Sequence, residues 1–124
     1  MARYSHLPIY KLSYSLARDI FSLQEKLPKS LKHTIGQKLF DTSVSCVDNI
    51  IIANSAEEKL LHLKSVGFLI ERSWTFLRML YDFKGITQGE FCAVSERLNE
   101  ITKQLLAWMK WEKDRLKREK SETK

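Results

Sequence analysis

The side chains that most often carry metal or acid–base chemistry are few and widely spaced in this sequence. His6, His33 and His62 fall in three different segments, and none has a carboxylate or cysteine at a metal-ligand spacing. His62 follows Glu58 by four residues, which is more typical of a pair on one helix face than of a ligand set. We therefore predict no metal site, no cofactor and no catalytic residue. The alternative is an active site that only the fold assembles.

The two cysteines offer no clearer chemistry. Cys46 and Cys92 lie in different apolar segments, form no CxxC pair and have no neighbouring histidine or cationic cluster that would activate a thiol. We expect both to act as small, buried hydrophobic side chains in a reducing cytoplasm. The sequence also contains no GxGxxG, P-loop or GxSxG motif, which favours a binding protein over an enzyme.

Basic side chains are the stronger candidates for function. Lys and Arg number 21 against 15 Asp and Glu, which gives a formal net charge of +6. This surplus favours an anionic partner such as nucleic acid, although a basic protein without such a partner has the same charge. The candidate residues for binding nucleic acid or a partner are Lys64, Arg72, Arg78, Arg97 and Lys103. Arg72 and Arg78 stand out because a guanidinium can bind phosphate in bidentate fashion, and Lys29, Lys32 and Lys38 form a further cluster.

The elements that position these side chains are predicted to be helical. The sequence has only four Gly and two Pro, and its apolar residues recur at steps of three and four. We predict an all-α, up-down-up-down four-helix bundle with helices at about 8–27, 30–54, 56–84 and 88–111. A long coiled coil is the alternative. Within the third predicted helix a strict 3-4 heptad stripe marks the face that we expect to pack in the bundle, and its members are Leu60, Leu63, Gly67, Ile70, Trp74, Leu77 and Tyr81. Residues 112–124 are predicted to form a charged tail that is either frayed or an exposed helical extension.

Capping signals mark the predicted helix boundaries. Pro8 suits a first helical turn, and Pro28 ends the first helix. The segments 55–58 and 87–90 each match a capping box, in which a Ser or Thr and a Glu three residues later bond to each other's backbone N–H. Gly85 is placed to cap the end of the third helix.

The apolar pattern is wider than one bundle core needs. A bundle helix needs about three of every seven positions apolar, but the first and third predicted helices each carry a second stripe. The members of these stripes are Tyr10, Tyr14, Phe21, Leu69, Phe76, Leu80 and Phe83. Apolar surface outside a core implies association, so we predict that these residues form an oligomer interface. The alternative is a wide core that encloses them.

An ordered set of short segments resembles a known family. The segments are Leu7–Leu16, the Leu27-Pro28 break, Gly36 followed by Leu39, Ala53-Asn-Ser55 before a Leu/His/Leu run, and Gln104–Lys110. Up to about residue 111, they resemble the accessory variability determinant (Avd) proteins of diversity-generating retroelements. A related branch contains four-helix-bundle proteins encoded in 23S ribosomal RNA intervening sequences, which usually carry Asn-Ile-x-Glu-Gly at the end of the second helix. This chain has Asn49-Ile-Ile-Ile-Ala53 there, which favours the retroelement branch.

The resemblance implies an assembly and a role. Proteins of this family form ring- or barrel-like homopentamers with basic surfaces. They bind the reverse transcriptase of the retroelement and its RNA or DNA, and thereby support mutagenic retrohoming. The reverse transcriptase carries the catalytic residues, so the resemblance implies a non-catalytic accessory protein. The alternatives are an RNA-binding protein of the 23S ribosomal RNA branch and a structural scaffold.

The sequence also predicts where the protein works. No signal peptide precedes the first predicted helix, and apolar runs such as Ile50 to Ala53 are only a few residues long. A membrane span needs about 20 apolar residues. We therefore expect a cytoplasmic protein that has no membrane partner.

Overall fold

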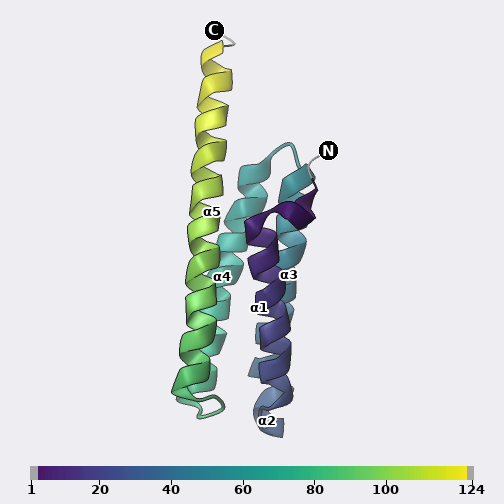
Figure 1. Cartoon of the computed structure of the whole chain (residues 1–124), viewed down its shortest axis with the longest axis vertical. Coiled ribbons are helices and arrows are strands. Elements are labelled where there is room, and N and C mark those ends of the chain that lie inside the picture. The colour runs from purple at the N-terminus through teal and green to yellow at the C-terminus, as the bar shows by residue number, and fades with distance from the viewer. Residues whose placement is uncertain (1–2, 123–124) are drawn as a thin grey trace.

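Four long helices build the molecule. A computed structural model describes residues 3–122, and every regular element in that range is helical, which confirms the all-α prediction. The long helices are α1 (Pro8–Glu25), α3 (Ile35–Ser55), α4 (Lys59–Asp82) and α5 (Gln88–Glu122), and the short ones are the 3-10 helix η1 (Tyr4–His6) and α2 (Lys29–Lys32). The long helices lie side by side in up-down-up-down order, and α5 continues beyond the others at one end (Figure 1).

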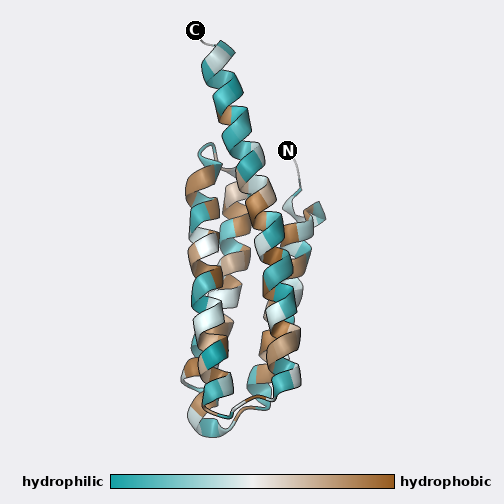
Figure 2. Ribbon diagram, turned by 90° about the vertical axis from the view of Figure 1, so that its left-hand side faces the viewer, coloured by the Kyte–Doolittle hydropathy of each residue, from teal (hydrophilic) through white to brown (hydrophobic). Residues whose placement is uncertain are grey.

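A single apolar core lies between the four helices. α3 packs against α1 and α4, and α5 also packs against α1 and α4, so each helix has two neighbours. Fully buried leucines come from every long helix, among them Leu16, Leu39, Leu77 and Leu98. Hydrophobic residues are spread along all the packed helices, whereas the projecting part of α5 is mostly hydrophilic (Figure 2).

The core face of α4 differs from the predicted heptad stripe. The predicted stripe includes Gly67, Trp74 and Tyr81, but these residues are only half-buried. The fully buried positions include their neighbours Val66, Ser73 and Leu80 instead. The buried Ser73 hydroxyl donates a hydrogen bond to the Leu69 carbonyl at 2.9 Å, so a polar residue is tolerated there. Because α4 packs against both α3 and α5, its buried face is wider than a simple 3-4 alternation marks.

The predicted helix at 30–54 is wrong as a single element. The chain forms α2, breaks at His33 and Thr34, and resumes as α3 at Ile35. Thr34 has the non-helical dihedrals φ −117° and ψ −100°. The buried Gln24 of α1 compensates for the break, because its Nε2 donates to the Lys32 carbonyl at 3.0 Å. A long-range contact of this kind leaves no local signal in the sequence.

The first predicted capping box is also wrong. Ser55 is the last residue of α3, and its hydroxyl donates to the Ile52 carbonyl at 3.4 Å. Glu58 is the N-cap of α4 and makes no side-chain capping bond, so α4 begins at Lys59 rather than at residue 56. The structure instead caps the preceding helix. Lys59 Nζ donates to the carbonyls of Ala53 and Asn54 at 3.0 and 2.7 Å, near the end of α3.

The connection between α4 and α5 confirms the second capping box. The Glu90 backbone N–H donates to Thr87 Oγ1 at 3.1 Å, and the Thr87 N–H donates to Glu90 Oε1 at 2.8 Å. The predicted glycine cap is displaced by one residue. Lys84 adopts the left-handed conformation with φ 63°, and the Gly85 N–H donates to the Leu80 carbonyl at 2.8 Å. This is the six-residue closure of a Schellman motif, with a lysine where glycine is usual.

The end of α5 differs from the prediction of a helix ending at 111. α5 continues to Glu122, so the charged segment within 112–122 is a helical extension, while residues 123–124 lie outside the described residues. Its first residue, Glu112, is buried, and its carboxylate accepts a hydrogen bond from Arg115 Nε at 2.8 Å. Among residues 3–122, no helix combines the length and apolar character that a membrane crossing requires.

Candidate binding surfaces

An open groove with a largely apolar lining lies between α4 and α5. It encloses about 490 Å³ and is lined by Lys64, Gly67, Phe68, Ile70, Glu71, Trp74, Thr102, Leu105, Leu106 and Met109. Phe68 and Leu106 stand at its rim with 61% and 59% of their surface exposed. Large apolar side chains exposed to this degree beside a groove are typical of a contact surface.

A second groove lies on the other side of Phe68, between α3 and α4. It encloses about 500 Å³, and its lining includes Asn49 of α3 together with Leu61, Lys64, Phe68 and Leu69 of α4. Leu61 is 62% exposed. Lys64 and Phe68 line both grooves, so this part of α4 forms a ridge between them. We call it the α4 ridge and define it by Leu61, Lys64 and Phe68.

Aromatic side chains form a row along α1. The ring centroids of Tyr4 and Tyr10 are 5.1 Å apart, and those of Tyr10 and Tyr14 are 6.1 Å apart. Further along the helix, Phe21 lies 5.8 Å from Phe40 of α3. The distances are in the range of favourable aromatic pairs.

The residues predicted to form an oligomer interface have different positions. Tyr14, Phe21 and Phe83 are exposed. Tyr10, Leu69 and Phe76 are half-buried against the core. Leu80 is fully buried within one chain, so it is not available to contact a second chain. The sequence pattern did not single out Leu61 and Phe68, because their 3-4 spacing continues into polar positions rather than into an apolar stripe.

The five predicted basic residues do not converge on one site. Lys64 lies on the α4 ridge, and Lys103 is exposed on α5. Arg97 Nε is 2.9 Å from Asp19 Oδ2 of α1, in a different groove between α1 and α5. Arg78 Nε is 3.0 Å from Asp82 Oδ1, and the guanidinium of Arg72 lies 5.4 Å from the ring centroid of Phe76.

Five lysines belong to the segments at the end of the bundle where α2 and the α4–α5 loop are found (Figure 1). We call it the basic end and define it by Lys26, Lys29, Lys32, Lys38 and Lys84. The stretch from Lys26 to Lys38 contains four lysines and a histidine but no Asp or Glu. The sequence indicated Lys29, Lys32 and Lys38 as a cluster. It did not indicate that Lys84, which is 46 or more residues away along the chain, lies at the same end.

The three histidines and the two cysteines do not form a site. His6 lies in η1, His33 follows α2, and His62 lies in α4. Within the described range 3–122, no three His, Cys, Asp or Glu side chains form a group that could hold a metal ion. Cys46 is buried as expected, and burial raises the pKa of its thiol to about 12. The expected burial is wrong for Cys92, because this residue lies on a face of α5 that is turned away from the core and exposed.

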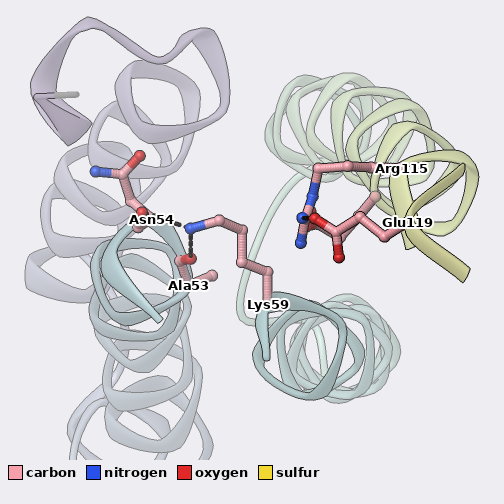
Figure 3. A network of polar contacts seen from close by, with 6 residues as sticks. Ala53, Asn54, Lys59, Arg115 and Glu119 are labelled. Carbon is pink, nitrogen blue, oxygen red and sulfur yellow. Dashed lines mark hydrogen bonds and ion pairs between the residues drawn. The ribbon is translucent and has the colours of Figure 1, made fainter. Parts of the chain in front are cut away.

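Polar contacts gather at the opposite end of the bundle. Lys59 reaches from the start of α4 to the last carbonyls of α3, and Arg115 pairs with Glu119 one turn further along α5 (Figure 3). Arg115 Nη2 also lies 2.6 Å from Glu112 Oε1. Because Arg115 is bonded on both sides, this end of α5 offers less free positive charge than its lysine and arginine content suggests.

Comparisons with known proteins add no relative to this description. No protein-family model matches the sequence, and no curated protein matches it.

Proposed function

We propose that this chain is a non-catalytic accessory protein of a diversity-generating retroelement. It forms a ring- or barrel-like homo-oligomer and binds the reverse transcriptase and RNA or DNA, so that the polymerase can copy a template mutagenically. The observation that supports assembly most strongly is the α4 ridge, where Leu61 and Phe68 are each more than 60% exposed beside two adjoining grooves. Burying such side chains against another chain is favourable by about 25 cal/mol for each Å² of apolar surface removed from water.

Charge supports the nucleic-acid part of the proposal. The net charge is +6, and the basic end presents exposed lysines on a stretch of chain without acidic residues. Long cationic side chains of this kind release counterions when they contact phosphates, which makes binding depend on salt. Contact with the phosphate backbone without sequence readout is the expected mode for such a surface.

The retroelement part depends on the family resemblance. A reverse transcriptase gene and paired repeats next to the coding sequence would support it. A location inside a 23S ribosomal RNA gene would instead support the intervening-sequence alternative.

The assembly is tested by light scattering. We expect the wild type to have a mass several times that of the 14.6 kDa chain, and five times that mass for a pentamer. Leu61→Asp combined with Phe68→Asp places two charges on the α4 ridge and should lower the mass while leaving the helical circular dichroism unchanged. Leu116→Asp, at an exposed position on the projecting part of α5, is the matched control and should keep the wild-type mass. A wild type that is monomeric at micromolar concentration would refute the assembly.

A further inference from the structure

We propose that the basic end is a binding site for the phosphate backbone of a single-stranded nucleic acid, with Phe83 as a stacking platform for a base. The inference depends on the proposed nucleic-acid binding and gives that function a location. It also moves the site away from the five basic residues that the sequence singled out, of which Lys64 and Arg97 line different grooves.

Packing holds the two halves of this site together. Gly85 lies directly against the segment from Lys26 to Lys38, which carries four of the five lysines of the basic end. A Cβ atom at Gly85 would lie 2.6 Å from Leu31 Cδ1 and 3.4 Å from Leu27 Cδ2. Lys84 and Phe83 precede Gly85 by one and two residues, so they lie close to the α1–α2 connection in space. A side chain at position 85 would have to displace the side chain of Leu31, so glycine allows the two segments to pack closely.

Two of the four carboxylates described at this end are paired with cations, and the other two accept hydrogen bonds from neutral donors. Glu25 lies 3.7 Å from Lys32, and Asp82 pairs with Arg78. Glu90 accepts the capping bond from the Thr87 N–H, and Asp41 accepts a hydrogen bond from Gln37 Nε2 at 2.9 Å.

The remaining lysines keep their charge available. In the described part of the chain, no carboxylate lies within 4.0 Å of the ammonium groups of Lys26, Lys29, Lys38 or Lys84. All four residues are exposed. An anion with several phosphates at neighbouring positions is the ligand that such a set of point charges fits.

The backbone of Lys84 gives a second, independent indication. A non-glycine residue in the left-handed region is disfavoured, and glycine is the usual residue at this position of a Schellman motif. The chain nevertheless has lysine there, with φ 63°. Backbone strain of this kind persists where another requirement outweighs it. Here the requirement that we infer is a positive charge at the basic end.

Phe83 supplies the feature that favours a single strand over a duplex. It precedes Lys84 in the chain, and 54% of its surface is exposed. An exposed aromatic ring next to cationic side chains stacks with unpaired bases without requiring a particular sequence. Bases in a duplex are already stacked, so a duplex gains nothing from this ring.

The test compares two variants that change the net charge equally. The basic-end variant carries Lys26→Gln, Lys29→Gln and Lys84→Gly, and the control carries Lys103→Gln, Lys110→Gln and Lys113→Gln, three exposed lysines of α5 outside the α4 ridge. The probe is a fluorescent oligouridine of about 12 nucleotides, and its affinity is measured by anisotropy over a salt series. Three lost phosphate contacts should lower the slope of log affinity against log salt by about 2 in the basic-end variant. The control should keep most of the wild-type slope.

The outcomes separate the two proposals. If the wild type does not bind the probe at any salt concentration, the proposed nucleic-acid binding fails. If the wild type binds and both variants lose the same slope, or only the control loses it, the location at the basic end is overturned. Binding of phosphatidylserine vesicles that the basic-end substitutions abolish, with RNA binding intact, would assign the site to a membrane surface and also overturn it.

Two single variants test the parts of the site. Lys84→Gly should weaken RNA binding while the melting temperature stays equal or rises, because glycine relieves the left-handed conformation. A lower melting temperature with unchanged binding would show that the Lys84 charge serves only the end of α4. Phe83→Ala should weaken binding without changing the salt slope. Unchanged affinity would remove the stacking role.

Discussion

Cys46 lies in the core of α3, where only 1% of its surface is exposed. Burial disfavours the thiolate and raises the pKa of this thiol to about 12. Cys92, on α5, is exposed instead. The sequence places both cysteines in apolar segments, and only the packing of the bundle distinguishes the inert thiol from the accessible one.

The pKa of Cys46 predicts how stability depends on alkaline pH. The unfolded chain loses the thiol proton near the ordinary pKa of 9.0, whereas the folded chain keeps it until about 12. The stabilising contribution is therefore complete below pH 9 and is lost as the pH rises toward 12. At about pH 10, the free energy of unfolding should fall by about 1.4 kcal/mol from this group. Urea titrations at several pH values check it, with Cys46→Ala as the control that lacks this part of the decrease. Equal slopes in both proteins would contradict the prediction.

Helix boundaries show which elements sequence patterns can predict. The capping box at 87–90 forms as predicted, because Thr87 lies in a short loop and its hydroxyl has no nearer backbone acceptor. The box at 55–58 does not form, because α3 extends through Ser55 and occupies its hydroxyl within the helix. A capping box is thus a local signal that holds only where tertiary packing ends the preceding helix earlier.

The two boxes give a matched pair of substitutions. Thr87→Ala removes a real cap and should lower the free energy of unfolding by about 1 kcal/mol. Ser55→Ala removes only a weak bond to the Ile52 carbonyl and should change it by less than about 0.5 kcal/mol. Chemical denaturation of the two variants measures both values. A larger loss for Ser55→Ala than for Thr87→Ala would reverse the assignment of the caps.

Interactions between distant segments account for what the helix patterns missed. The break before Ile35 is compensated by Gln24, which is 10 or 11 residues earlier, and the loop after the left-handed Lys84 packs against Leu31 through Gly85. The apolar period identifies a helix and its approximate buried face. It does not reveal which neighbouring helix packs on that face. For this reason the sequence pattern assigned Leu80 to an oligomer interface, whereas the structure buries it in the core.

At the scale of the whole molecule, one core joins all four long helices. The fold class and the helix order follow from the sequence because they depend on apolar periodicity and short connections. The candidate binding site does not follow, because it depends on which surface residues meet. The basic end combines residues from 26 to 84, and the α4 ridge depends on the orientation of one helix relative to α3 and α5.

The same division between core and surface predicts a contrast between two leucines of α5. Leu98 is fully buried and Leu106 is 59% exposed. Leu98→Ala should lower the free energy of unfolding by about 2–5 kcal/mol, because it removes buried methyl groups and leaves a cavity. Leu106→Ala should change it by less than about 0.5 kcal/mol when measured at low protein concentration. Comparable losses of stability for both variants would contradict the exposed position of Leu106 at the α4–α5 groove.

The even number of long helices has a practical consequence. Both ends of the described chain lie at the end of the bundle opposite the basic end (Figure 1). A fluorophore, affinity tag or biotin attached near either end would therefore sit at least one bundle length from the lysines. On a biosensor chip, molecules captured in this way would all present the basic end to the flowing solution, so surface attachment would not obstruct the nucleic-acid measurement.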